Sequence, residues 1–117
     1  MYRHVNNISF MRFMQSGRVM LWEATGLHKM HAEEGKGAML VATSCDFKKS
    51  LYYPGNAVVK TRVSSLGNKS FSLEHHITDD NGDLCAIGKD TVVFFDFKAE
   101  TSLSLYPELR RTLEEFS

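Results

Sequence analysis

One segment of this chain carries apolar residues at the spacing of an α-helix and on more than one side of that helix. Across residues 10–27 the apolar positions recur every three or four residues, and Gly26 is well placed to end the helix. The stripe consists of Phe10, Phe13, Met14, Gly17, Met20, Leu21 and Ala24, and Met11, Val19 and Trp22 lie off it. A helix of this kind is buried on several sides, so a curled sheet or a partner subunit has to cover it.

After this helix the apolar residues recur at every second position instead of every third or fourth. Residues 58–65 and 71–78 alternate between two sets of side chains, which predicts two strands with one wetter face. Two flanking strands are expected at residues 38–48 and 84–97. The connections are short and rich in turn residues, including the pair Asn81-Gly82, so neighbouring strands are expected to be antiparallel.

The remaining segments complete a single domain. Residues 28–37 carry charges and two glycines and are expected to form a loop. Residues 107–116 are expected to form a short terminal helix with Leu109 and Leu113 on one side. One long helix followed by four antiparallel strands belongs to the α+β class, and residues 1–117 are enough for one core.

Composition excludes several classes of protein. The formal net charge is +0, so there is no basic excess to support binding to nucleic acid. The longest apolar runs, such as residues 39–42, are far shorter than the roughly 20 residues that cross a bilayer. Cys45 and Cys85 are too few for a disulfide framework and lack metal-ligand spacing. They are expected to be reduced thiols in a cytoplasmic protein, with a lone disulfide as the alternative.

The run His4-Val5-Asn6-Asn7 directly precedes the long helix. A helix N-terminus presents free backbone N–H groups and the positive end of a dipole, so it can stabilise an oxyanion during acyl transfer. Asn6 and Asn7 are also favoured helix caps, and capping is compatible with catalysis. His4 titrates near neutrality and is either a base or a structural histidine.

Four parts of the sequence, taken in order, match a known family. Residues 2–18, 26–27, 47–55 and 67–70 resemble the hotdog-fold acyl-CoA thioesterases of the 4-hydroxybenzoyl-CoA thioesterase type, over nearly the whole chain. The resemblance implies a long central helix wrapped by a curved antiparallel sheet, paired into homodimers or homotetramers with active sites at the interface. It also implies hydrolysis of a fatty-acyl or aromatic acyl-CoA to the free acid and CoA, with no metal or redox cofactor.

The same resemblance assigns roles to individual residues. His4, Asn6 and Asn7 are the expected catalytic residues, and the backbone N–H groups near Asn7 and Ile8 polarise the thioester carbonyl. Ser70 resembles a small hydroxyl residue near the pantetheine or nucleotide part of CoA. The basic candidates for the phosphates are Arg62 and Lys69, with Lys60 and Lys89 nearby. Arg18 matches a family arginine, and a salt bridge or an interface contact explains it at least as well as catalysis.

Some acidic and histidine side chains have simpler expected roles. Glu23 lies roughly 24 Å from Asn7 along the helix and is expected to be exposed, while Asp46 stays unassigned. His75 and His76 point to opposite faces of a strand. His28 and His31 lack a third ligand, so no metal site is expected.

The sequence departs from the family at its start. Family members begin with another strand and carry an aspartate four residues ahead of the motif histidine, a position that precedes Met1 here. The catalytic carboxylate therefore maps onto no residue, and we expect impaired hydrolysis. Two alternatives remain: a non-catalytic acyl-CoA-binding module that keeps the pocket, and a hotdog dehydratase, for which no clear acid–base pair is found.

Overall fold

The computed structural model of the chain describes residues 7–49 and 56–117. In chain order the elements are α1 (Asn7–Thr25), α2 (Leu27–Glu34), β1 (Lys36–Phe47), β2 (Val58–Leu66), β3 (Ser70–Thr78), β4 (Leu84–Asp96), β5 (Thr101–Ser102) and α3 (Pro107–Glu114). His4, Asn6 and the Tyr53-Pro54-Gly55 turn lie outside the described residues.

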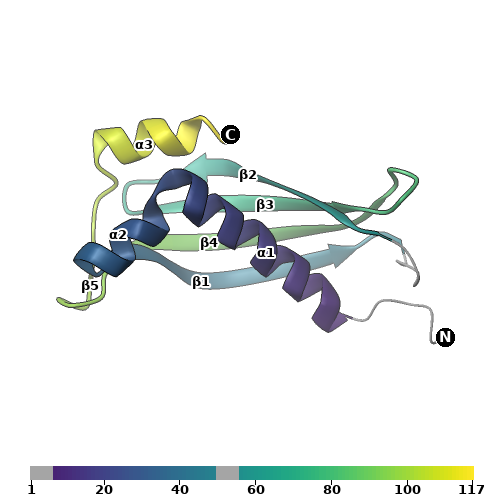
Figure 1. Cartoon of the computed structure of the whole chain (residues 1–117), viewed down its shortest axis with the longest axis horizontal. Coiled ribbons are helices and arrows are strands. Elements are labelled where there is room, and N and C mark those ends of the chain that lie inside the picture. Colours follow the sequence, from purple (N-terminus) through teal and green to yellow (C-terminus); the bar gives the residue numbers. More distant parts are fainter. Residues whose placement is uncertain (1–6, 50–55) are drawn as a thin grey trace.

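The strands form one antiparallel sheet in the order β1-β4-β3-β2, and the short β5 pairs with the end of β4. Helix α1 crosses one face of this sheet, and α3 lies beyond β2 at the end where α1 finishes (Figure 1). The α+β arrangement of a long helix against an antiparallel sheet is therefore confirmed. β5 was not predicted, because two residues are too short to show a repeat.

The helix ends where the sequence indicated, but the segment after it is not the expected loop. Gly26 adopts a left-handed conformation with φ 82°, which breaks α1, and α2 follows at once as far as Gly35 at φ 71°. Leu27 is fully buried and Met30 packs against the same core cluster. The loop prediction for residues 28–37 was wrong because the many charged residues of α2 conceal its short apolar side.

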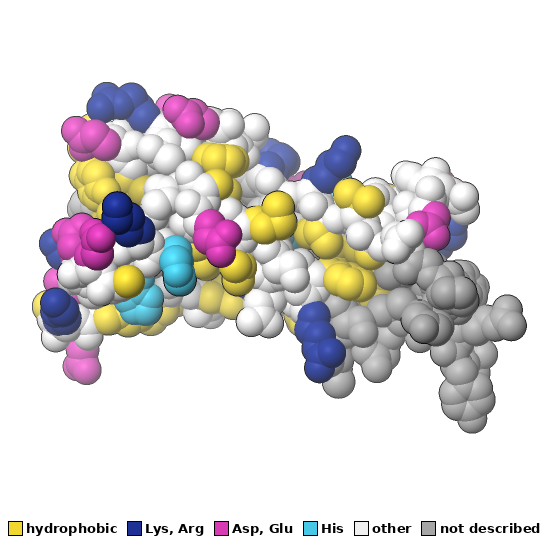
Figure 2. Space-filling view, viewed as in Figure 1, with side chains coloured by type: hydrophobic (Ala, Val, Ile, Leu, Met, Phe, Trp, Pro, Cys, Tyr) yellow, Lys and Arg dark blue, Asp and Glu magenta, His cyan; other side chains and the backbone are white. Residues whose placement is uncertain are grey.

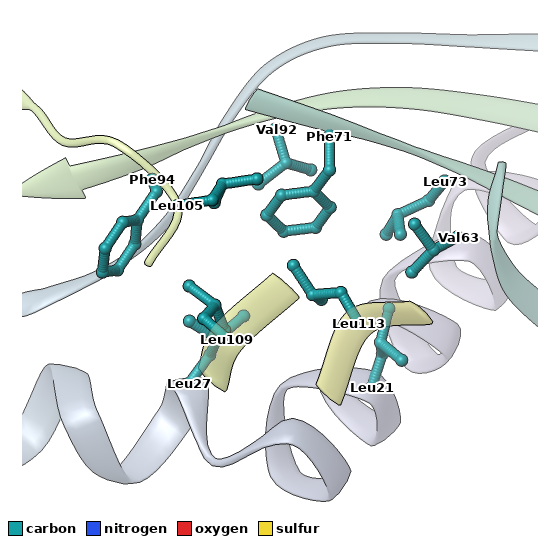
Figure 3. Packing of buried hydrophobic residues seen from close by; sticks show 10 residues of the cluster. All are labelled: Leu21, Leu27, Val63, Phe71, Leu73, Val92, Phe94, Leu105, Leu109 and Leu113. Atoms are coloured by element: carbon teal, nitrogen blue, oxygen red, sulfur yellow. The ribbon is translucent and has the colours of Figure 1, made fainter. Parts of the chain in front are cut away.

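Most of the core lies under the C-terminal half of α1. This larger cluster joins α1, α2, α3 and one half of the sheet and contains Leu21, Leu27, Val63, Phe71, Leu73, Val92, Phe94, Leu105, Leu109 and Leu113 (Figure 3). The terminal helix contributes its two buried leucines as predicted. A smaller cluster under the N-terminal half of α1 contains Phe10, Met14, Ile77, Cys85 and Ala86.

The two faces of the sheet differ as the alternation predicted. Along β3 the residues facing α1 are buried, and His75 is among them, while His76 belongs to the opposite, wetter face. Cys85 is buried, Cys45 is half-buried, and both thiols are free. Burial raises the pKa of each thiol. Within residues 7–49 and 56–117, no helix is long and apolar enough to cross a membrane.

Candidate functional site

Helix α1 begins at Asn7, so the backbone amides of Asn7 and Ile8 lie in its first turn as predicted. That turn contains no acidic side chain, so no carboxylate of its own neutralises the positive end of the dipole. The helix start lies over the end of β1, because the rings of Phe10 and Phe47 meet edge to face with centroids 5.0 Å apart. Ile77, near the end of β3, belongs with Phe10 to the smaller core cluster.

The turn between β2 and β3 lies at the other end of the sheet. Ser70 starts β3 and is separated from Ile77 by seven residues, or roughly 23 Å of strand. Lys69 is exposed, and its backbone carbonyl accepts a 2.9 Å hydrogen bond from the N–H of Phe94. Within one chain, therefore, the structure does not bring Lys69 and Ser70 to the start of α1.

Arg62 lies on the sheet face away from α1. Its Nη2 is 3.5 Å from Oε2 of Glu74, which stands opposite it on β3, and Lys89 is opposite Glu74 on β4. Hydrogen bonding to His76 and the charge of Arg62 lower the pKa of Glu74. The guanidinium is half-exposed, so it can still bind an anion from solvent.

Beneath the middle of α1 lies a polar network that contains the salt bridge considered for Arg18, but whose other members were not predicted from the sequence. Arg18 Nη1 donates to Asp90 Oδ2 at 2.9 Å, and His75 Nε2 lies 2.6 Å from the same oxygen. Thr61 Oγ1 lies 2.7 Å from His75 Nδ1. Helix α1 and strands β2, β3 and β4 each supply one of these residues. The sequence held one indication of this network. Asp90 lies between Gly88 and Val92 in the set of alternate β4 residues that face the core, and a charged residue at such a position needs a partner.

The charge state of this network follows from its geometry. Burial by itself would raise the pKa of Asp90, but the bonds from His75 and Arg18, with the Thr43 hydroxyl nearby, outweigh it and lower the pKa. The carboxylate is therefore ionised and only accepts hydrogen bonds. His75 then has a proton on Nε2, and in the neutral imidazole Nδ1 accepts from the hydroxyl of Thr61.

Other candidate side chains are spread over the surface. Glu23 is exposed as expected, and Asp46 is exposed on β1. His31 stacks against Phe97 with ring centroids 4.8 Å apart. In the part of the chain that the structure describes, no three His, Cys, Asp or Glu side chains converge in a group able to hold a metal ion.

Known proteins resemble this chain over nearly its whole length. The sequence model of a family described as the thioesterase-like superfamily matches residues 1–113. The long-chain acyl-CoA thioesterase FadM of Escherichia coli (strain K12) is 24% identical over 115 residues, which are 97% of this chain and 87% of FadM.

Solved structures show the same fold. The probable thioesterase YbaW of Escherichia coli superimposes with a TM-score of 0.81 at 25% identity, covering 98% of this chain and 87% of that one. A Thermus thermophilus thioesterase, complexed with coenzyme A and Zn, superimposes with a TM-score of 0.81 at 20% identity, covering 96% of this chain and 85% of that one. The hotdog fold expected from the sequence is therefore confirmed.

Proposed function

Since the chain belongs to the thioesterase-like superfamily, we propose that it is a thioester hydrolase that converts a fatty-acyl or aromatic acyl-CoA to the free acid and CoA. The observation that carries the proposal is the start of α1 at Asn7, with no acidic side chain in its first turn. Backbone amides at a helix start can stabilise an oxyanion. FadM, a relative over most of the chain, is a long-chain acyl-CoA thioesterase.

In this proposal the backbone amides at the start of α1 and the side chains of the His4–Asn7 run have different roles. The amides of Asn7 and Ile8 would hold the oxygen of the attacked carbonyl. His4 would take a proton from the attacking water, and Asn6 and Asn7 would orient the thioester. Arg62 and Lys69 would bind the phosphates of CoA and Ser70 the pantetheine arm. A Thermus thermophilus relative has been solved with coenzyme A, which supports CoA as the carrier.

A second copy of the chain would complete this site. Lys69 and Ser70 lie too far from the start of α1 within one chain, so the two halves of the site would come from different subunits. The surface fits this assembly: Leu40, Val41 and Phe47 are exposed on the edge strand β1, and Met20 is exposed on α1. Figure 2 shows hydrophobic side chains at the surface on the side where α1 lies. Sedimentation of a monomer at micromolar concentration would contradict the shared site.

Release of free thiol from acyl-CoAs of different chain length tests the activity. His4→Ala and Asn6→Ala are expected to lower kcat, the first by about 10²–10⁴-fold if His4 is the general base. Arg62→Ala and Lys69→Ala are expected to raise KM for CoA esters but not for short thioesters without the nucleotide. Lys29→Ala is the matched control, because Lys29 is an exposed lysine on α2 that is not assigned to the CoA site. Unchanged kcat in His4→Ala would refute its role.

The alternative is a binding module that does not turn over its ligand. The same first turn of α1 favours it, because none of its residues is acidic and none can supply the catalytic carboxylate. Binding of acyl-CoA by calorimetry, with no thiol release above the uncatalysed rate, would establish this alternative. Hydrolysis that is saturable in acyl-CoA would exclude it.

A further inference from the structure

Three residues of the buried network stand in the order that activates a hydroxyl. Thr61 Oγ1 lies 2.7 Å from His75 Nδ1, and His75 Nε2 lies 2.6 Å from Asp90 Oδ2. In the neutral imidazole with its proton on Nε2, the hydroxyl donates to Nδ1 and Nε2 donates to the carboxylate. A nucleophile next to a base, with the base oriented by a carboxylate, is the arrangement of acyl-transfer triads. Arg18 fixes the carboxylate from the helix side at 2.9 Å.

Thr61, the residue of the triad that carries the hydroxyl, lines an apolar pocket. A pocket of about 150 Å³, open to solvent, lies between α1, β2 and the residue Phe116 that follows α3. Its lining consists of Gly17, Met20, Leu21, Ala24, Val59, Thr61 and Phe116, of which Thr61 alone has a polar side chain. Gly17 lets α1 pack directly against Thr61, because a Cβ at this position would overlap Thr61 Oγ1.

The free edge of β2 supplies a hydrogen-bond donor beside the hydroxyl. The N–H of Val63 points away from β3, since it donates to the carbonyl of Phe116 at 2.8 Å. Backbone direction alternates along an antiparallel strand, so the N–H of Thr61 points to the same edge. An amide next to the nucleophile can stabilise an oxyanion that forms there.

We propose that Thr61 is the nucleophile of a second acyl-transfer site, with His75 as its base and Asp90 as the residue that positions His75. The site is separate from the start of α1, because Gly17 lies ten residues, or about 15 Å of helix, from Asn7. A cavity of about 150 Å³ is large enough to hold benzene. The site therefore takes activated esters or thioesters, and acyl groups up to the size of a benzoyl group fit inside the pocket.

The reaction balances without a cofactor. Thr61 Oγ attacks the acyl carbon while its proton passes to His75 Nδ1, and the carbonyl electron pair moves to the oxygen facing the Thr61 N–H. Collapse of this intermediate breaks the bond to the leaving group, which departs with the proton from His75. The products are acyl-Thr61 and the free alcohol or thiol. Water then repeats the two steps, releasing the carboxylic acid and restoring the hydroxyl.

Acylation by p-nitrophenyl acetate, p-nitrophenyl benzoate and p-nitrophenyl dodecanoate tests the proposal on the whole chain. The first two are expected to give a burst of nitrophenolate and one acyl group per chain by intact mass, mapped by peptide sequencing to Thr61. The dodecanoate, whose chain is too long to fit inside the pocket, is expected to give a smaller burst. Labelling of lysines alone, or an equal burst with all three esters, would overturn the proposal.

Isosteric variants separate catalysis from folding. Thr61→Val is expected to lose the acyl adduct, Thr61→Ser to keep it, and Thr91→Val, which removes an exposed hydroxyl from β4, to match the original chain. Circular dichroism checks that each variant is folded. An adduct that persists in folded Thr61→Val, or is missing from both the original chain and Thr61→Ser, would refute the site. Acyl-CoA hydrolysis is assayed in parallel, so failure of either reaction is seen independently.

Discussion

Two charged clusters in this chain have nearly the same geometry and opposite surroundings. In the buried cluster, Arg18 and His75 lie 2.9 and 2.6 Å from Asp90, and in the exposed cluster Lys49 lies 3.0 and 2.7 Å from Asp79 and Asp83. The side chains of Asp90 and His75 are 0% exposed, whereas those of Lys49 and Asp83 are 42% and 58% exposed. Distance alone therefore says little about what each cluster contributes to stability, and solvation decides it.

The clusters also hold different parts of the fold. The buried cluster fastens α1 to three strands at the middle of the sheet, between the large and the small core clusters. In the exposed cluster, Lys49, which follows β1, bonds to the turn between β3 and β4. Loss of the first changes where α1 sits on the sheet, while loss of the second affects only the connection of two loops.

The largest effect is expected from Asp90→Ala. This change leaves Arg18 and His75 without their shared partner in a buried site, and breaking a buried pair in this way costs about 3–5 kcal/mol of unfolding free energy. Urea denaturation followed by the fluorescence of Trp22, which contacts Phe71 in the core, measures it. Asp46→Ala is the control, because it removes an exposed carboxylate. Equal losses in the two variants would show that burial is not decisive.

The second effect is expected from Gly17→Ala, which disturbs the same cluster by steric overlap. The new Cβ would overlap Thr61 Oγ1 and lie 2.9 Å from His75 Nδ1. Alanine improves helix propensity by about 1 kcal/mol, but overpacking a buried contact costs about 1–3 kcal/mol, so we expect net destabilisation. Ser16→Ala is the neighbouring control, since Ser16 is exposed and its hydroxyl donates to the carbonyl of Arg12 within the helix. A Gly17→Ala variant more stable than the original chain would contradict the close approach.

Elements with a long repeat could be predicted from the sequence, and contacts between distant strands could not. The helical spacing of residues 10–27 predicts α1, and the alternation of residues 71–78 predicts β3. A pattern sustained over this many residues fits either a helix or a strand, but not both. The network around Asp90 depends instead on register: Thr61 faces His75 across one strand pair, and β4 brings Asp90 beside them. Nothing local in the sequence determines which inward residues become neighbours.

Acid removes the negative charge from the carboxylates of both clusters. The pKa of Asp90 is lowered in the folded chain, so its contribution is present above the ordinary carboxyl pKa and is lost as the pH falls through the folded value. Asp79 also has a lowered pKa, through its hydrogen bond from Lys49, so acid weakens both clusters. Between about pH 7 and pH 3, Asp90→Asn is expected to lose less stability than the original chain. Parallel losses in the two proteins would show that Asp90 ionisation does not contribute.

The smallest effect is expected from Lys49→Ala. When the ammonium is removed, Asp83 stays in water, and Asp79, whose side chain is 14% exposed, keeps its hydrogen bonds from the backbone, so no fully buried charge is left uncompensated. The turn also keeps its own bonds, because Asp79 Oδ1 accepts the backbone N–H groups of Asn81 and Asp83 without help from Lys49. We therefore expect the urea midpoint of Lys49→Ala to stay close to that of the original chain. The remaining difference should shrink as salt is added, since exposed pairs are screened. A loss comparable to that of Asp90→Ala would mean that geometry, not solvation, sets the energy of both clusters.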